Sequence, residues 1–208
     1  MNRTAKPSGE TLRVAPRRDL CLDFANTLSY RGGDAQESLH DFAELVGWCA
    51  TNALLGAYGG ERALRWSEQH PEQATATFAD AIAIREASYR IFYAITARKI
   101  PPPRDVAAVN RALAAAPARR VLIRGTKGFC WQVDRVGFSA PTLLAPVLWS
   151  AGDLMVSRDT IRLRHCSNEQ CLWLFLDDSK NGSRRWCSMQ ACGNRAKAHR
   201  HYLRTRTV

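Results

Sequence analysis

The sequence contains no long apolar run and no obvious targeting segment. No stretch of about 18 uncharged apolar residues occurs in its 208 residues, which excludes a transmembrane helix. Residues 1–10 lack the apolar core and cleavage pattern of a secretory signal, so we expect a cytoplasmic protein. With 46% hydrophobic and 24% charged residues, the composition also excludes a fibrous or wholly disordered chain.

Acidic side chains are scarce, and the resulting positive charge is unevenly distributed. The chain has 19 acidic residues against 30 lysines and arginines, which gives a formal net charge of +11. Residues 160–208 hold ten basic and three acidic side chains and so contribute +7 of that charge. We therefore divide the chain into a flexible basic arm at 1–18, a mainly helical domain at 19–158 and a basic domain at 159–208.

The middle segment has the apolar periodicity of a helical domain. Apolar residues recur there at spacings of three and four, and glycines and prolines interrupt the pattern between segments. Helices are predicted over residues 38–55, 61–69, 71–99 and 104–116. The apolar segment 141–157 predicts one more, which Pro146 indicates starts near Ala145. Residues 121–124 and 129–133 flank a glycine-bounded turn, which predicts a β-hairpin. The fold class is therefore mainly α, with a multihelical N-terminal domain and one small hairpin.

Cysteine is nearly absent from the body, where Cys21, Cys49 and Cys130 are isolated, and is concentrated near the C-terminus. Four cysteines form two C-x4-C pairs separated by fifteen residues: Cys166, Cys171, Cys187 and Cys192. This spacing fits a tetrahedral zinc site, and four thiolates leave no open position for catalysis, so the zinc is structural. Two disulfides or four unpaired thiols are the alternatives, which a reducing compartment disfavours. His165 and His199 flank the cluster and are alternative ligands, although an ordinary polar or phosphate-facing role is favoured.

The residues around the cysteines predict a treble-clef-like finger. Residues 172–177 alternate as a strand does, and Asn181-Gly182 is a strong turn signal. Good helix formers follow Gly193, which places Cys192 near a helix N-terminus. A turn, a hairpin and a helix would then close on one zinc ion.

The terminal helix and the hairpin tip are densely basic. Lys197, Arg200 and Arg204 share one helix face, and a polyanion would relieve their mutual repulsion. We predict duplex DNA as the partner and assign the contacts to Lys180, Arg184, Arg185, Arg195, Lys197, Arg200 and Arg204. The alternatives are a zinc-stabilised protein-interaction adaptor without direct DNA contact, and a solvated basic tail. Trp173 and Trp186 are assigned to the finger's small core in preference to base stacking.

Polar residues within apolar runs of the body suggest either a brace or a ligand pocket. Asp23 could accept from a helix N-terminus or pair with Arg85, which lies on the apolar stripe of the longest helix. The alternative is a small-effector pocket lined by Asp23, Asn26, Trp48, Arg85 and Tyr89. No nucleophile with its base, carboxylate pair or phosphate loop is recognisable, so we expect no enzymatic activity.

Two stretches resemble known bacterial families. Cys192-Gly193-Asn194-Arg195 is the tetrapeptide that names the CGNR zinc-finger family, and the WLFLD and NGSRRWCSM segments before it are similar to that family as well. Leu22–Thr27 resembles the ABATE domain, described as a stress-induced transcription regulator, with weaker similarity around Trp48 and Arg85. The resemblance implies a mainly helical regulator that binds DNA and carries four cysteine ligands.

The last two residues of the tetrapeptide allow two interpretations each. Asn194 can brace the second cysteine knuckle through its amide or contact DNA. Arg195 can pair with an acid such as Asp177 or donate to a phosphate.

Overall fold

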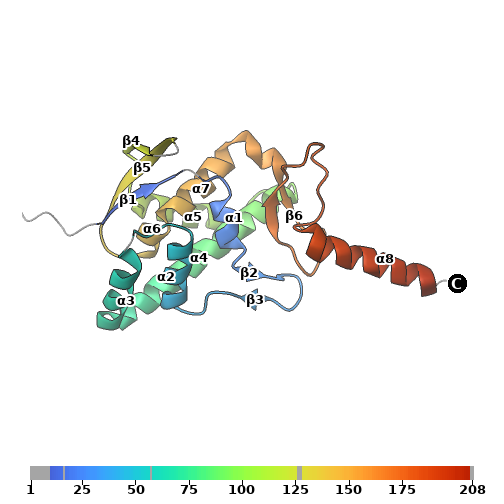
Figure 1. The fold of residues 1–208 in the computed structure, drawn as a ribbon, viewed down its shortest axis with the longest axis horizontal. Helices are drawn as coiled ribbons and strands as arrows, with labels where there is room; N and C mark the ends of the chain where they lie inside the picture. The colour runs from blue at the N-terminus through green and yellow to red at the C-terminus, as the bar shows by residue number, and fades with distance from the viewer. Residues whose placement is uncertain (1–9, 16, 57, 126–127, 207–208) are drawn as a thin grey trace, which may run out of the picture.

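A computed structural model describes residues 10–15, 17–56, 58–125 and 128–206. The ribbon shows a helical body, a small sheet at one end of it, and a long C-terminal helix that projects from the opposite end (Figure 1). In the described part of the chain, no helix combines the length and apolarity that a membrane span requires.

Seven helices form the body in the part of the chain that the structure describes. They are α1 (Leu20–Ala25), α2 (Phe42–Thr51), α3 (Gly59–Gln69), α4 (Pro71–Thr96), α5 (Pro103–Ala115), α6 (Ala140–Leu143) and α7 (Ala145–Val156). The long α4 contacts α1, α2, α3, α5 and α6 and so forms the axis of the body. Helix α2 begins later than the apolar pattern predicts, because the Asp41 side chain accepts from the Glu44 N–H and caps it there.

The predicted hairpin is present and belongs to a three-stranded sheet. Strands β4 (Val121–Gly125) and β5 (Gly128–Arg135) pair antiparallel, and β1 (Glu10–Val14) pairs with the other edge of β5. The prediction of a flexible arm is therefore wrong for residues 10–14. Leu12 and Val14 alternate with polar neighbours, and both are buried in the apolar cluster under the sheet. Residues 1–9 of the predicted arm lie outside the described residues.

The core of the body extends into the cysteine-rich segment. A 3₁₀ turn (Arg158–Arg162) leads from α7 to β6 (Leu163–His165), which pairs antiparallel with β7 (Leu174–Leu176). Leu163, Leu174 and Leu176 belong to the same buried apolar cluster as α1, α4 and α7. A short ladder of β2 (Leu28–Ser29) and β3 (Gln36–Glu37) borders a loop that reaches toward this segment (Figure 1).

Candidate metal centre

Two short turns bring the four cysteine sulfurs together. The first turn joins β6 to β7, and the Cys166 N–H donates to the Trp173 carbonyl at its base over 2.8 Å. The second is the single wide turn Met189–Gly193, which leads into α8 (Asn194–Arg206). Ser188 caps this turn by accepting from the Ala191 N–H at 3.3 Å. The first turn presents two sulfurs, and Cys187 before the second turn and Cys192 within it present the other two toward the same point.

The spacing of the sulfurs fits zinc and excludes disulfides. All four Sγ atoms lie within 4.8 Å of one another, and Cys187 Sγ is 3.7 Å from the Sγ atoms of both Cys171 and Cys192. Four sulfurs bound at about 2.3 Å to one zinc ion stand roughly 3.8 Å apart, whereas a disulfide requires about 2.05 Å. The hydrogen bond with Cys166 raises the pKa of the Cys171 thiol to about 12. Zinc binds the thiolate form, so a zinc ion between the four sulfurs would favour their ionisation.

The finger differs in three respects from the predicted hairpin. The strand is shorter than residues 172–177, and its partner is β6, which precedes the first cysteine. No strand follows Asn181-Gly182 in the described chain, although Gly182 has the left-handed φ of +59° that the predicted turn requires. The fold class is confirmed, since a knuckle, a hairpin and a helix N-terminus surround one tetrahedral site.

The finger is docked on the body through one buried asparagine. The Asn26 amide donates to the Leu174 carbonyl at 2.8 Å and accepts from the Leu174 N–H at 3.0 Å. It thereby satisfies both backbone groups of a residue in β7, as a neighbouring strand would. Asn26 is 4% exposed, so water does not replace these bonds. This residue is a brace between two parts of the chain.

The loop after β2 fits against the first cysteine turn. The Gly32 N–H donates to the Gln170 carbonyl at 3.2 Å, and a Cβ at Gly32 would overlap the carbonyl oxygen of Glu169. Nearby, the Tyr89 hydroxyl donates to the Leu172 carbonyl at 3.0 Å. The close approach explains why the loop carries a glycine at this position.

Arg195 also joins the finger to the body. Its guanidinium donates to the Tyr30 hydroxyl at 2.5 Å and lies 5.3 Å from the centre of that ring. The predicted pairing with Asp177 is wrong, because Asp177 is buried and accepts from Ser179 and from the Arg184 N–H. The Ser179 hydrogen bond is the main cause that lowers the pKa of the Asp177 carboxyl. Asn194 donates to the Gln190 carbonyl at 3.2 Å, which is a bracing contact within the turn.

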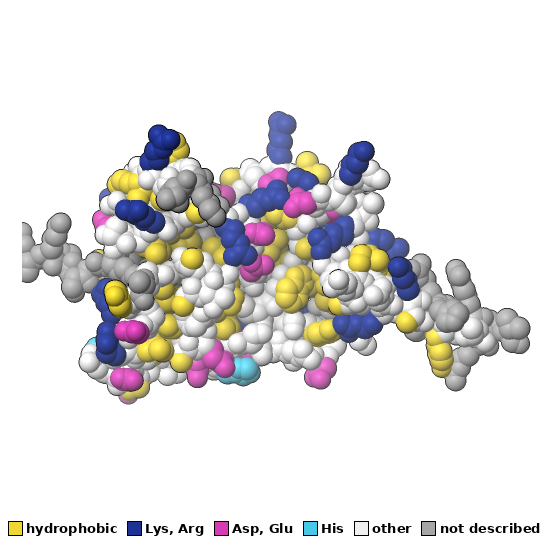
Figure 2. Space-filling model, in the orientation of Figure 1, with side chains coloured by type: hydrophobic (Ala, Val, Ile, Leu, Met, Phe, Trp, Pro, Cys, Tyr) yellow, Lys and Arg dark blue, Asp and Glu magenta, His cyan; other side chains and the backbone are white. Residues whose placement is uncertain are grey.

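The residues predicted to contact DNA occupy different environments. Lys180, Arg185 and Lys197 are exposed. Arg184 folds back on the finger, where it donates to the Trp186 and Cys187 carbonyls and lies 4.5 Å from the centre of the Phe175 ring. The side chains of Arg200 and Arg204 lie outside the described residues. Figure 2 shows dark blue cationic side chains around the end of the molecule where β6 and α8 lie.

The two tryptophans of the finger differ in exposure. Trp186 is partly buried and packs against the cysteine cluster, whereas the side chain of Trp173 is 36% exposed. Trp186 therefore has the environment expected of a core residue, and Trp173 lies at the edge of the finger.

Asp23, one of the five predicted effector residues, does not meet the others. It faces solvent with its side chain 41% exposed and pairs with Arg17, so the predicted pairing with Arg85 is wrong. Trp48 packs on Phe24 with the ring centres 5.0 Å apart. Asn26 and Tyr89 bind backbone groups of the finger, as described above. The cavities described below are lined by other residues.

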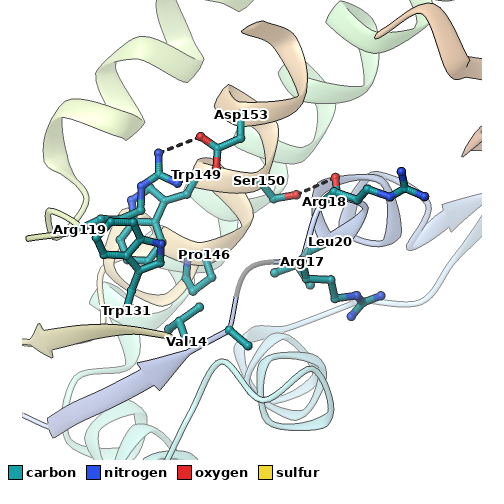
Figure 3. Close-up of a pocket in the computed structure, with 11 residues that line it drawn as sticks. Val14, Arg17, Arg18, Leu20, Arg119, Trp131, Pro146, Trp149, Ser150 and Asp153 are labelled. Atoms are coloured by element: carbon teal, nitrogen blue, oxygen red, sulfur yellow. Dashed lines mark hydrogen bonds and ion pairs between the residues drawn. The ribbon is translucent and has the colours of Figure 1, made fainter. Parts of the chain in front are cut away.

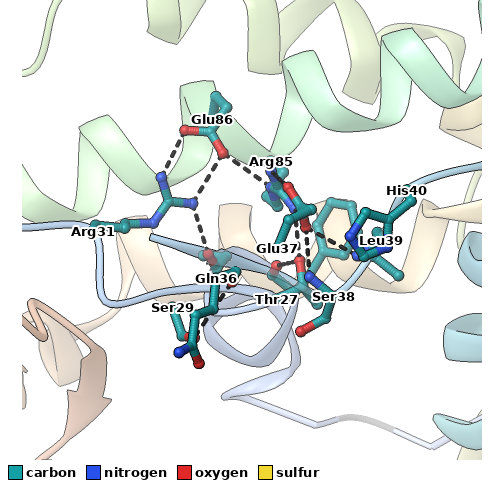
Figure 4. A network of polar contacts seen from close by, with 12 residues as sticks. Thr27, Ser29, Arg31, Gln36, Glu37, Ser38, Leu39, His40, Arg85 and Glu86 are labelled. Atoms are coloured by element: carbon teal, nitrogen blue, oxygen red, sulfur yellow. Dashed lines mark hydrogen bonds and ion pairs between the residues drawn. The ribbon is translucent and has the colours of Figure 1, made fainter. Parts of the chain in front are cut away.

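Arg85 belongs to a buried ionic network that the sequence did not reveal. Its guanidinium donates to both Glu37 oxygens at 2.6 Å and to Glu86 at 2.9 Å, and Arg31 binds Glu86 from the other side (Figure 4). Burial raises the pKa of the Glu37 carboxyl, but hydrogen bonds from Arg85, Leu39 and Ser38, together with the Arg85 charge, outweigh burial and hold the pKa below its usual value. Arg31 lies 3.8 Å above the Tyr89 ring and so connects the network to the finger contact. No local sequence pattern identified Glu37, which is far from Arg85 in the chain.

A cavity of about 310 Å³ lies between β1, β5 and α7 (Figure 3). Trp131 and Trp149 form one wall, with the Arg119 guanidinium 5.7 and 5.6 Å from their ring centres. Arg119 also pairs with Asp153 at 2.5 Å. The backbone and side chain of Arg18 border the opposite side, and its guanidinium reaches Asp178 in the finger at 2.5 Å. Sequence reasoning missed this site because its residues come from four separate segments.

Together the fold and the metal centre define a mainly helical protein with a C-terminal zinc finger. A family model for the ABATE domain, with the description "Putative stress-induced transcription regulator", matches residues 18–158, and a model for the CGNR zinc finger matches residues 162–205. The chain therefore belongs to the ABATE family and carries a CGNR zinc finger, which binds a structural zinc ion. Neither is a family of enzymes. No curated protein matches the chain.

Proposed function

We propose that the protein is a non-enzymatic transcription regulator that binds duplex DNA through its finger and α8. The proposal rests on the charge and the exposure of α8. The helix has no acidic residue, carries five lysines and arginines, and none of its described side chains is buried. The described side chains of the helix therefore bury little apolar area on the body, and the charge of the helix suits the phosphates of a duplex.

The attachment of α8 supports the same role. Its first turn is fixed by the metal centre through Cys192 and by the contact between Arg195 and Tyr30. Beyond that turn the helix projects from the molecule (Figure 1). An α-helix is narrow enough to enter the major groove of DNA. The zinc ion therefore sets the direction in which a cationic helix is presented.

The test is duplex binding measured as a function of salt. If about four phosphates are neutralised, the logarithm of the binding constant should fall against the logarithm of salt with a slope near −3.6. The double variant Arg200→Ala and Arg204→Ala should bind more weakly, with a slope shallower by about 1.8, and should keep its zinc. Alanine preserves helix propensity, so the change removes charge without breaking the helix.

A matched control removes the same charge elsewhere. Arg111→Ala with Arg124→Ala changes two exposed arginines of α5 and β4 and should bind duplex like the parent. Equal affinity of the α8 variant and the parent would reject α8 as the contact surface. A flat salt response in the parent would reject DNA binding and favour the adaptor function.

We also infer that the body binds a small planar organic acid in the cavity of Figure 3 and thereby affects the finger. The two indole rings suit a flat ligand. Arg119 is paired with Asp153, whose side chain is 56% exposed, so the ligand's carboxylate would bind the guanidinium in place of Asp153. Arg18 gives a physical connection, because its carbonyl accepts from Ser150 at 3.3 Å while its guanidinium binds Asp178. This location replaces the five residues predicted from the sequence, which do not surround a common cavity in the contacts described above.

Benzoate is a suitable probe of this cavity. Calorimetry with the zinc-loaded protein should show saturable binding that Arg119→Gln weakens roughly tenfold, because the variant loses a charge-assisted hydrogen bond. Arg111→Gln, an exposed position on α5, serves as the control. Identical titrations of the parent and Arg119→Gln would contradict an organic-acid site here.

A further inference from the structure

A second hollow, of about 300 Å³, lies on the finger away from the sulfurs. It is bordered by the C-terminal end of α4, by β6 and by the loop after β7. Its lining residues are Thr96, Arg164, His165, Ser167, Gly182, Ser183, Arg184 and Arg185. None of these residues carries a carboxylate, while three carry a guanidinium and three a hydroxyl. The lining is therefore suited to an anion.

Two of the three arginines of this hollow, Arg164 and Arg184, are held by neutral groups. Arg164 Nη1 donates to the Ile161 and Leu163 carbonyls at 2.6 and 2.9 Å, and Arg184 Nε donates to the Trp186 carbonyl at 2.9 Å. Within the described residues, neither of them nor Arg185 forms an ion pair. In contrast, Arg85, Arg90 and Arg119 of the body each bind a carboxylate. Arg164 and Arg184 are thus positioned, and none of the three guanidinium groups is neutralised by a carboxylate within the described residues.

Asp177 is the acid that acts electrostatically on Arg164, yet it does not line the hollow. Its oxygens accept from the Ser179 N–H at 3.0 Å, the Ser179 hydroxyl at 2.6 Å and the Arg184 N–H at 2.9 Å. Asp177 is 1% exposed. Asp177 therefore holds the loop after β7 in position, and its carboxylate is not part of the lining of the hollow.

The remaining walls are held in position as well. His165 Nδ1 shares a hydrogen bond of 2.8 Å with Thr96 Oγ1, and its ring lies 5.0 Å from the Tyr93 ring. The Ser167 N–H donates to the Arg185 carbonyl at 2.8 Å, which ties the loop to the first cysteine turn. A site with pre-positioned donors loses little conformational entropy when a ligand binds.

We propose that this hollow binds one phosphate group. A guanidinium fork matches two phosphate oxygens, and the hydroxyls of Ser167 and Ser183 can serve the others. The phosphate belongs either to a duplex backbone, which rests on the proposed DNA binding, or to a free phosphate monoester. In both cases Arg164 and Arg185 supply the main charge.

The first experiment tests the phosphate site without DNA. Inorganic phosphate is titrated into the zinc-loaded full chain while the ring resonances of His165 are followed by NMR, with sodium chloride at equal ionic strength as reference. Phosphate should move these resonances and chloride should not. Arg185→Gln should weaken the phosphate response about tenfold, because a charge-assisted hydrogen bond is lost. The Arg185 guanidinium makes no hydrogen bond recorded in the described chain, so this variant keeps the fold.

The second experiment measures duplex binding against salt for Arg164→Gln with Arg185→Gln. Loss of one phosphate contact should make the slope shallower by about 0.9. Arg111→Gln with Arg124→Gln is the control of equal charge, and zinc content confirms that the finger is intact. If the slope changes, the phosphate is that of the duplex.

The outcomes separate the two proposals. A phosphate response without any change in the duplex slope keeps the site and assigns it to free phosphate monoesters. A phosphate response in a protein that binds no duplex also keeps the site, although the proposed function then fails. An unchanged His165 signal with phosphate, together with an unchanged duplex slope, overturns the phosphate site.

Discussion

Asn26 shows how one side chain can determine the position of a metal-binding segment. Its amide binds both backbone groups of Leu174, which lies 148 residues further along the chain. The sequence suggested a polar brace through Asp23 and named Asn26 only in the effector pocket, whereas in the structure Asn26 is the brace. Its partner could not be predicted, because nothing local to either residue specifies the other.

Asn26→Ala should destabilise the protein by about 3 kcal/mol. The change leaves the N–H and the carbonyl of Leu174 buried without partners, and each unsatisfied group costs roughly 1–3 kcal/mol. Urea unfolding at equilibrium measures the effect. Asn110→Ala, on the exposed side of α5, is the control and should change stability by less than about 0.5 kcal/mol. A matching midpoint for Asn26→Ala and the parent would show that the amide does not support the finger.

At the scale of elements, α8 has a first turn that is held by the metal centre and by Tyr30, and a remainder whose described side chains are exposed. A helix of 13 residues is marginally stable in water unless it packs against something, and no described side chain of α8 is buried. Its stability should therefore depend on its partner.

Hydrogen exchange should reveal this dependence. In the free protein, amides beyond the first turn of α8 should exchange far faster than those of α4, which crosses the core. Addition of duplex should slow exchange in α8 and leave α4 unchanged. Strong protection of α8 in the free protein would indicate that a contact with the protein itself already stabilises it.

The elements differ in how well the sequence predicted them. The long helices carry many apolar residues at regular spacing, so α4 and α5 were predicted to within a few residues. The strands β6 and β7 have three residues each, which is too short for a periodic signal, and they are defined by their pairing around the cysteine turn. Strand β1 does alternate, but its position in a basic, proline-containing segment favoured the wrong interpretation.

The metal ligands were predictable, whereas the surfaces around them were not. Cysteine spacing is a local property, and the four sulfurs meet as expected. The hollow at Arg164 and His165 depends on three segments that converge only in the fold. Likewise, the contact of Arg195 with Tyr30 depends on how the finger docks.

At the scale of the whole molecule, the finger and the body share one apolar core. Leu163, Leu174 and Leu176 contribute to the cluster that also contains Leu22 and Phe92. The stability of the two parts should therefore be linked, although each part matches its own family model.

Removal of zinc should lower the stability of the body as well as that of the finger. Cys187→Ser removes one of the four sulfur ligands and should therefore lose the metal. Structural zinc contributes roughly 10 kcal/mol or more to the stability of small fingers, so its loss should destabilise the finger. Circular dichroism should then show a lower melting temperature for the helices of the body, and the metal content should fall in parallel. Ser183→Ala, in the exposed loop of the finger, should leave both quantities unchanged. An unaltered melting temperature in the metal-free variant would show that the body folds independently.

The hydrogen bonds between Asn26 and the Leu174 backbone affect any attempt to separate the finger from the body. A fragment that begins at residue 162 would expose the backbone edge of β7 and three leucines that the body now covers. Open strand edges beside apolar side chains promote aggregation. A truncated finger should therefore precipitate unless its new surface is masked, and swapping this module between unrelated proteins would require transplanting α1 and the loop through Gly33 along with it.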